Sequence, residues 1–315
     1  MPNDTHVFGG GWTDEKLSIL SKYLEAYTTA LKDQPFRKLY IDAFAGTGRR
    51  EDSAAAKAKR KALEAGQLQL SESDGADEFL DGSAAIALKS DPPFDEYIFV
   101  EMLPSRCRKL EELKRDFPAR ARSITILQDD ANTAIQRLSA KEWKSRRAVL
   151  FLDPYGVQVK WSTIEAIAAT KAIDLWVLFP LSGVNRMLTN DGEIPDTWRS
   201  KLDDLLGTND WESELYKPDS QPQSRLPFDD LDGGDEHQRR VKQKVQVLAD
   251  YFLARLNTVF PHVAKKPAIL KNSRNSPLFM FCFAAGNEKG GQIALRIANH
   301  ILKMEPLRHG KRLKH

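Results

Sequence analysis

Five short apolar runs, separated by stretches with helical periodicity, constrain the fold of this chain most strongly. Each run is rich in Ile, Leu, Val or aromatic residues and is too continuous for a strand with one solvated face, so it is typical of a buried parallel strand. Strands that alternate with helices predict an α/β fold with a doubly wound, Rossmann-like sheet. The five runs span residues 38–44, 96–101, 123–128, 148–153 and 172–180.

The remaining segments predict how the chain is organised around this sheet. Residues 12–32 have the pattern of an amphipathic helix that Pro35 ends, so we expect a helical N-terminal segment over 1–36 and the core over 37–188. Residues 189–236 are polar and rich in turns, with one weak helix near 196–206, and we interpret them as an insertion for substrate recognition.

The C-terminal part is expected to complete the sheet. Residues 237–304 hold a predicted long helix over 237–258, two strands at 268–273 and 276–286, and a last helix over 292–303. The two strands lie close enough in sequence to pair, which predicts a seven-stranded sheet with one antiparallel strand. Residues 305–315 form a basic tail.

Composition restricts the class of protein but not its partner. The 315 residues are 41% hydrophobic and 29% charged, without a signal-like start or an apolar run of 18 residues, so a cytoplasmic globular protein is expected. Cys107 and Cys282 are far apart and each is in a stretch typical of packed structure, so we expect no metal centre. The net charge of +3 is too small to indicate a nucleic-acid partner, although basic residues cluster at 57–61, 144–147 and 308–314.

Acidic residues follow four of the five predicted strands. Asp42, Glu101 and Asp153 end the first, second and fourth strands, and the third runs into Asp129 and Asp130. Carboxyl ends of parallel strands meet at one edge of a sheet, where these carboxylates repel one another unless a ligand or a donor satisfies them. The pattern therefore predicts a binding site at this edge.

The loop in YIDAFAGTG, residues 40–48, separates the possible ligands. A P-loop needs Lys followed by Ser or Thr after Gly48, and this chain has neither pair there. A dinucleotide fingerprint needs a third glycine, and Glu51 occupies that position. Acids at the strand ends also disfavour a diphosphate. A ligand that fits is S-adenosylmethionine (SAM), with Glu101 on the ribose hydroxyls, Asp130 on the adenine amine and Asp42 toward the methionine end. The predicted SAM contacts are Asp42, Ala43, Phe44, Ala45, Gly46, Gly48, Glu101, Met102, Asp130 and Ala131.

The sequence AVLFLDPYG at residues 148–156 predicts a site for an exocyclic amine. Such an amine is a poor nucleophile because its lone pair is delocalised into the ring. Hydrogen bonds to the Asp153 carboxylate and the Pro154 carbonyl would draw the nitrogen toward a tetrahedral geometry, and Tyr155 would stack on the ring. A strand end followed by a Pro-containing turn, with Tyr155 packed on the core, is the structural alternative.

With these residues placed, the chain resembles the three-Cys-motif partner (TcmP) family. The matching stretches lie at residues 12–36, 40–48, 81–88, 100–107, 128–132, 151–161 and 174–188. The resemblance implies a class I SAM-dependent methyltransferase fold and a three-cysteine, radical-SAM-like protein as partner. Residues 189–265 have no confident match.

The layout is also similar to that of RlmJ-type ribosomal RNA adenine methyltransferases. Their glycine loop is followed by an insertion, a Gly-Ser-Pro helix start and DPPY; here Ala84 replaces the Pro, and Tyr155 arrives one residue early. DPYG is closer to the DPFG of tRNA guanine dimethyltransferases. Both relatives methylate exocyclic amines of RNA bases, so the similarity implies an RNA or DNA base as substrate.

Three functions stay open at this point. The first is a SAM-dependent methyltransferase that acts on a nucleobase amine in RNA or DNA. The second is a methyltransferase for a protein or a small molecule, which the modest charge favours. The third is a non-catalytic SAM-binding module that partners the three-Cys protein; such a module need not retain the residues 153–155.

Overall fold

The computed structural model describes residues 11–48, 82–218, 240–272 and 274–304. Two of the basic clusters, at 57–61 and 308–314, and residues 219–236 of the predicted insertion lie outside the described residues. None of the helices in the described part is both long and apolar enough to cross a membrane.

The five apolar runs form five strands, as the sequence predicts. They are β1 (Arg37–Asp42), β2 (Glu96–Glu101), β3 (Ile124–Gln128), β4 (Arg146–Leu152) and β5 (Ile173–Phe179). The helices between them are α3 (Ser83–Lys89), α4 (Pro104–Asp116), α5 (Ala131–Ser139) and α6 (Trp161–Ala169), with a 3-10 helix η1 (Pro118–Ser123) before β3.

The strand order is that of a doubly wound sheet. It runs β3-β2-β1-β4-β5-β10-β8, and β9 also pairs with β10. Strands β1 to β5 are parallel, whereas β10 (Pro277–Ala285) runs antiparallel to β5, β8 (His262–Val263) and β9 (Ala268–Lys271). The predicted doubly wound, Rossmann-like sheet with one antiparallel strand is thus confirmed. The sheet has eight strands rather than seven because the two-residue β8 also pairs with β10.

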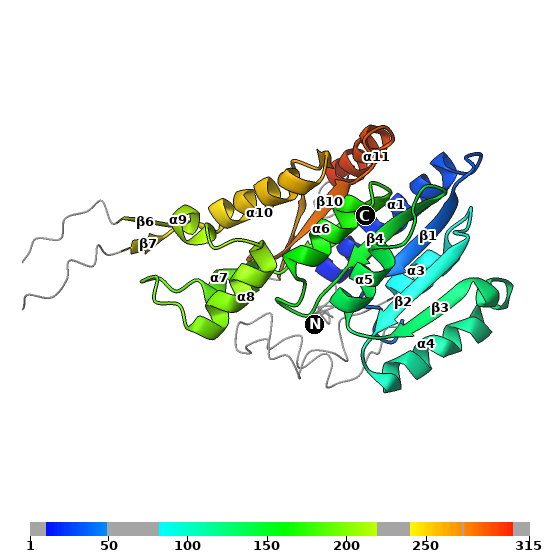
Figure 1. Cartoon of the computed structure of the whole chain (residues 1–315), viewed down its shortest axis with the longest axis horizontal. Coiled ribbons are helices and arrows are strands. Elements are labelled where there is room, and N and C mark those ends of the chain that lie inside the picture. Colours follow the sequence, from blue (N-terminus) through cyan, green and yellow to red (C-terminus); the bar gives the residue numbers. More distant parts are fainter. Residues whose placement is uncertain (1–10, 49–81, 219–239, 273, 305–315) are drawn as a thin grey trace, which may run out of the picture.

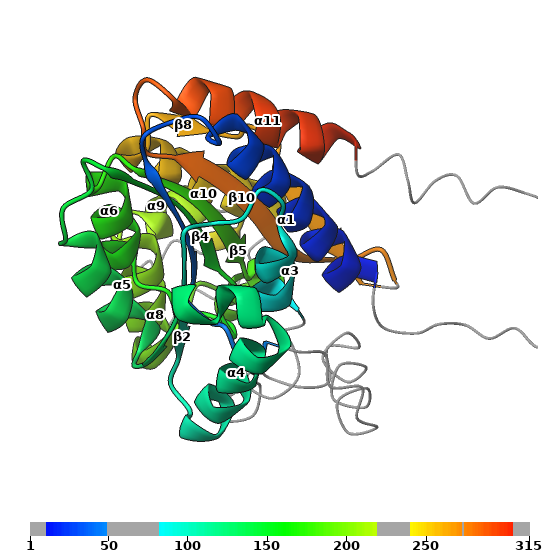
Figure 2. The same cartoon turned by 90° about the vertical axis from the view of Figure 1, so that its right-hand side faces the viewer.

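Helices cover both faces of the sheet (Figures 1 and 2). Helix α1 (Gly11–Ala30) and α11 (Gly291–Met304) pack on one face with α3 and α4, while α5, α6 and α10 (Val245–Val259) pack on the other. Alternating residues of β4 divide between the two cores, with Val149 and Phe151 facing α1 and Leu150 and Leu152 facing away. The N-terminal helix is therefore an integral layer of the fold.

The segment after β5 is more ordered than its polar composition suggests. It contains α7 (Leu181–Met187), α8 (Asp196–Leu206), α9 (Trp211–Leu215) and a hairpin of β6 (Tyr216–Pro218) with β7 (Arg240–Lys242). Helix α8 has the predicted bounds. Its Leu202 and Leu206, with Trp211 of α9, join the core on the sheet face that α5, α6 and α10 cover.

The predicted helix over 237–258 is wrong at its start, because α10 begins only at Val245. Residues 240–242 pair with β6 instead. The Lys242 ammonium there donates to the carbonyl oxygens of Asn185 and Leu188, which fixes this strand against the end of α7.

Candidate functional site

The carboxyl ends of β1 to β4 surround a cavity of about 460 Å³. It lies beside the point where the strand order reverses between β1 and β4, the usual ligand position in a doubly wound sheet. Its size is that of a small-molecule pocket. Six predicted SAM contacts line it: Ala43, Phe44, Glu101, Met102, Asp130 and Ala131. Tyr155, from the predicted amine site, lines the same cavity.

Glu101 is the most buried acid in this cavity, with 6% of its surface exposed. Its Oε1 accepts a hydrogen bond of 2.8 Å from the Leu103 amide, and its Oε2 lies 3.6 Å from an Arg106 guanidinium nitrogen. These two contacts fix the carboxylate while each oxygen keeps a lone pair. Glu101 can therefore still accept hydrogen bonds from a ligand.

Asp130 immediately precedes α5, and one of its carboxylate oxygens is already hydrogen-bonded within the protein. Its Oδ1 accepts from the Thr133 amide at 2.9 Å and from the Thr133 hydroxyl at 3.1 Å, which is an N-cap. Asp129 beside it pairs with Arg137 at 2.8 Å. Asp130 is exposed and lines the cavity, so its other oxygen is the acceptor available to a ligand amine.

Apolar side chains form the rest of the wall that carries Glu101. Met102 is 60% exposed although it is large and hydrophobic, and it lines the cavity together with Leu103 and Phe44. An exposed methionine beside a fixed carboxylate can cover the face of a planar ring. The cavity thus combines acceptors for hydroxyl and amine groups with a surface for a heterocycle.

Asp42 does not line the cavity, because it is completely buried. It accepts hydrogen bonds from the Ser83 hydroxyl at 2.7 Å and from the Phe44 amide at 3.2 Å. Burial raises the pKa of Asp42 to about 7, the Ser83 hydrogen bond opposes that rise and the nearby Asp153 charge adds to it. In this structure Asp42 holds the loop after β1 and the start of α3 in place; direct contact with a cofactor stays a prediction.

The glycines of the loop also lie outside the cavity lining. Gly46 and Gly48 have φ of 57° and 69°, which favour glycine, and Ala45 is buried. A Cβ on Gly48 would lie 2.9 Å from Leu113 Cδ1 and 3.0 Å from Leu110 Cδ2. Gly48 therefore lets the loop pack closely on α4, a reason different from the predicted approach of the backbone to a ligand.

Asp153 follows β4 and forms a buried ion pair that the sequence analysis missed. Lys16 of α1 donates to Asp153 Oδ2, and the two residues are 1% and 6% exposed. The ammonium also lies 5.4 Å from the ring centre of Trp12 and 5.8 Å from that of Phe151. Burial raises the pKa of Asp153, and the Lys16 charge and hydrogen bond lower it. Lys16 thus favours the ionised carboxylate that an amine-binding site needs.

Pro154 and Tyr155 continue from Asp153 toward the cavity. Pro154 is buried and does not line it, whereas Tyr155 is half-buried and does. The Tyr155 amide donates to Gln158 Oε1 at 3.0 Å, and Gly156 has a φ of 70° that allows the turn. The predicted amine site and the predicted SAM contacts therefore meet at Tyr155.

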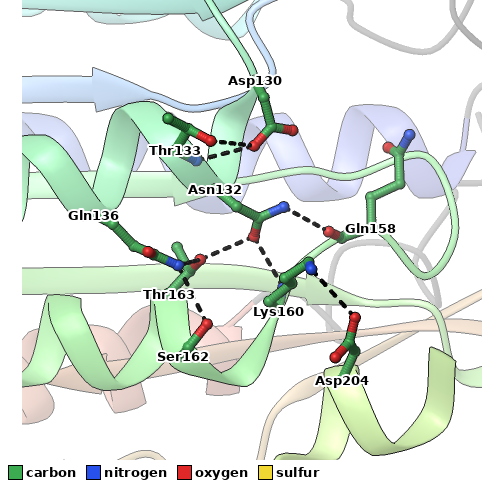
Figure 3. A network of polar contacts seen from close by, with 9 residues as sticks. All are labelled: Asp130, Asn132, Thr133, Gln136, Gln158, Lys160, Ser162, Thr163 and Asp204. Carbon is green, nitrogen blue, oxygen red and sulfur yellow. Dashed lines mark hydrogen bonds and ion pairs between the residues drawn. The ribbon is translucent and has the colours of Figure 1, made fainter. Parts of the chain in front are cut away.

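Asn132 fixes this turn to α5 (Figure 3). Its side-chain amide donates to the Gln158 carbonyl at 2.9 Å, and its oxygen accepts from the Lys160 amide at 2.9 Å and from the Thr163 hydroxyl at 2.9 Å. Lys160 in turn pairs with Asp204 of α8 at 3.3 Å. The segment after β4 is thus held between α5 and the helices that follow β5.

Sequence signals for the missed residues differ in strength. Lys16 lies on the buried stripe of α1 between Trp12 and Leu20, and a lysine on an apolar stripe is a detectable anomaly. Arg106 and Asn132 carry no such mark, because their partners are set by the turn geometry after β2 and β4.

The basic cluster at residues 144–147 does not belong to this site. Arg146 and Arg147 begin β4, and Asp153 follows the other end of the same seven-residue strand. At about 3.3 Å per residue the two ends are roughly 20 Å apart. This cluster therefore lies at the opposite edge of the sheet from the cavity.

Comparisons with known proteins found distant structural similarities and no family. No protein-family model matches the chain, and no curated protein matches its sequence. Among solved structures, a Legionella pneumophila protein of the DUF519 family is 13% identical, with 94% of this chain and 93% of that chain covered and a TM-score of 0.46. YcgJ of Bacillus subtilis is 9% identical, with 84% and 95% covered and a TM-score of 0.30.

A third similar structure is yhhF of Escherichia coli, a proposed methyltransferase. It is 12% identical, with 51% of this chain and 70% of that chain covered and a TM-score of 0.28. All three TM-scores are below 0.5, so the fold assignment rests on the strand order and strand directions of this chain itself.

Proposed function

We propose that this protein is a SAM-dependent methyltransferase that modifies an exocyclic amine of a nucleobase in RNA or DNA. The observation that carries the proposal is the meeting of two sites at the carboxyl edge of the sheet. The cavity lined by Glu101, Asp130 and Tyr155 fits a nucleoside-like cofactor, and the Asp153 carboxylate, held by Lys16, lies two residues before Tyr155.

The donors and acceptors around the cavity fit SAM better than a phosphate-containing nucleotide. Three carboxylates line it, and the one arginine among its lining residues is paired with Glu101. Glu101 would accept from the ribose hydroxyls, Asp130 from the adenine amine, and Met102 would cover the adenine ring. SAM would supply an electrophilic methyl group on a sulfonium. A diphosphate would face repulsion from the same carboxylates.

Asp153 would hold and orient the substrate amine. Lys16 binds Oδ2, and within the described residues no hydrogen bond reaches the other oxygen, which can accept from an amine hydrogen. The Pro154 carbonyl would accept the second hydrogen, and Tyr155 would stack on the base. The proton that the amine loses after methyl transfer can pass to the Asp153 carboxylate or to water. Rate then depends mainly on holding the amine in line with the methyl group.

The position of the segment after β5 supports a macromolecular substrate. The Lys160–Asp204 ion pair joins α8 to the loop that carries Tyr155, so the predicted recognition segment begins beside the predicted amine site. Membership of the TcmP family, a three-Cys radical-SAM-like partner and the RlmJ-like layout belong to this proposal as well. They rest on the sequence resemblance.

One observation favours the alternative of a non-catalytic SAM-binding module. Lys16 already occupies an oxygen of Asp153 in a buried ion pair. If Asp153 serves only to anchor α1, the cavity would bind SAM without transferring its methyl group. This alternative keeps the proposed SAM binding but not the proposed methyl transfer.

Transfer of a tritiated methyl group from SAM to fractionated cellular RNA, DNA and protein tests the proposal. We expect label in a nucleic-acid fraction and in a methylated base after digestion. Label in the protein fraction alone would refute the nucleobase substrate. SAM binding without label in any fraction would favour the binding module.

A further inference from the structure

A second cavity, of about 450 Å³, lies at the opposite edge of the sheet. Its walls come from the C-terminal half of α1, the N-terminal half of α11 and the first residues of β4 and β5. Arg147 lies here, a strand length of roughly 20 Å from Asp153. Nothing in the proposed methyl transfer uses this cavity.

Asp174 is a buried carboxylate that faces this cavity without a cationic partner. It is 6% exposed, and its Oδ2 accepts a hydrogen bond of 2.7 Å from the Tyr23 hydroxyl. Within the described part of the chain, its other oxygen accepts no hydrogen bond and it forms no ion pair. A buried carboxylate with one neutral donor is under-satisfied, and a ligand that brings N–H donors would correct this.

Arg147 provides a positive group on the same face of the sheet. Asp174 pairs in register with Val149, and residues two apart on a strand face the same side, so Arg147 and Asp174 are diagonal neighbours. Their Cα atoms are then roughly 8 Å apart, from a strand spacing of about 4.8 Å and a rise of about 3.3 Å per residue. The Arg147 guanidinium is fixed by stacking on Phe36, at 3.9 Å from the ring centre.

Most of the remaining wall is apolar, although Gln34, Asn287 and a second basic residue, Lys289, also line it. Leu31 of α1 and Ile293, Ala294 and Ile297 of α11 line the cavity, and Ile293 is 50% exposed. The rings of Tyr23 and Tyr27 lie on the side of Asp174. A ligand therefore meets one acid, two basic residues and an apolar surface together.

We propose that this cavity binds a small zwitterion with a large apolar side chain, of which the aromatic and branched α-amino acids are the simplest. The ammonium group binds Asp174 beside the tyrosine rings, the carboxylate binds Arg147, and the side chain packs between α1 and α11. A purely cationic ligand is repelled by Arg147 and a purely anionic one by Asp174, so the pair of charges selects a molecule that carries both.

Calorimetric titration of the full chain with L-phenylalanine and L-leucine tests this site. Two analogues each lack one charge, namely 2-phenylethylamine without the carboxylate and 3-phenylpropionate without the ammonium. We expect saturable binding of an amino acid, and at least about tenfold weaker binding of both analogues. No binding of either amino acid up to about 10 mM, which corresponds to roughly 3 kcal/mol, overturns the proposal. Equal binding of phenylalanine and its two analogues also overturns it, because the cavity is then an apolar gap only.

Variants assign the contacts. Asp174→Asn keeps the acceptor for Tyr23 but loses the charge, and Arg147→Met keeps an apolar stem; each is expected to weaken phenylalanine binding at least tenfold. Lys144→Met is the matched control, because Lys144 belongs to the same basic cluster, is exposed and does not line the cavity. If Asp174→Asn binds phenylalanine as the unmodified protein does, Asp174 has a structural role only and the assignment is wrong.

Discussion

The two edges of the sheet each hold a buried acid, but the two acids are satisfied in different ways. At the carboxyl edge, Asp153 is paired with the buried Lys16. At the amino edge, Asp174 accepts a hydrogen bond from the Tyr23 hydroxyl and forms no ion pair within the described residues; burial raises its pKa to about 7, although that hydrogen bond and the Arg147 charge oppose the rise. The pKa of Asp153 is also raised by burial, but the paired Lys16 opposes the rise and favours the carboxylate, whereas a neutral donor leaves the charge more dependent on pH or on a ligand. The comparison shows that the charge of a buried acid depends on its neighbouring donors and cations as well as on its burial.

Removal of Lys16 should have the largest effect on stability. Lys16→Met leaves Asp153 buried without its cation, so we expect the free energy of unfolding to fall by about 3–5 kcal/mol in urea denaturation. Lys32→Met, on the exposed turn after α1, is the matched control and should change it by less than about 0.5 kcal/mol.

A second substitution tests whether the cause is the uncompensated charge. The double variant Lys16→Met, Asp153→Asn should recover part of the loss, because the charge is then absent. Equal loss in the single and double variants would show that Lys16 contributes packing rather than charge.

The amino edge should make stability depend on pH. Because the folded pKa of Asp174 is about 7 and its ordinary value is 3.8, the folded state keeps a proton that the unfolded state has lost between these values. The contribution of Asp174 to stability is therefore largest below about pH 4, falls as the pH rises to about 7 and then levels, and amounts to at most about 4 kcal/mol.

Asp174→Asn removes this contribution and should flatten the pH profile of the urea midpoint relative to the unmodified protein. Asp42, whose pKa is also raised to about 7, contributes in the same direction and stays in both proteins. Identical profiles would mean that Asp174 is ionised in the folded state and that the contrast between the two edges fails.

The smallest effect is expected from the hydrogen bonds that position the loop after β4. Asn132→Ala removes three of them, and we expect a loss of about 1–3 kcal/mol and slower methyl transfer with little change in SAM affinity. Gln136→Ala is the matched control, because within the described residues the Gln136 side chain donates only to Ser162 and Thr163 at the start of α6. Equal effects of the two variants on transfer would contradict a positioning role for Asn132.

The sequence predicted the features of this molecule that depend on local pattern. Five continuous apolar runs were sufficient to place the five parallel strands along the chain, and acids after those runs were sufficient to locate the carboxyl edge. The pairing of Lys16 with Asp153 could not be predicted, because 137 positions separate them and only the packing of α1 on the sheet brings them together. Asp174 was missed for a related reason, since its apolar strand hid an isolated acid whose significance comes from the cavity beside it.

The start of α10 was misjudged because helical periodicity does not register a short hairpin strand. Residues 240–242 pair with β6 through backbone groups, and the Lys242 side chain reaches carbonyls of a segment more than fifty residues earlier. Gly48 is a similar case, because its position in a glycine loop suggested contact with a ligand and the structure shows close packing against Leu113 and Leu110.

The central claim is that cofactor and amine are bound by separate acids at the carboxyl edge, and one paired measurement tests it most directly. SAM affinity by calorimetry and tritiated methyl transfer should be measured side by side for Asp153→Ala and Glu101→Ala, with Glu111→Ala on the exposed side of α4 as control. We expect Asp153→Ala to lose transfer by about 10²–10⁴-fold while SAM affinity stays nearly unchanged. Glu101→Ala should weaken SAM binding at least about tenfold. Loss of SAM binding in Asp153→Ala, or unchanged SAM binding in Glu101→Ala, would contradict the division of roles.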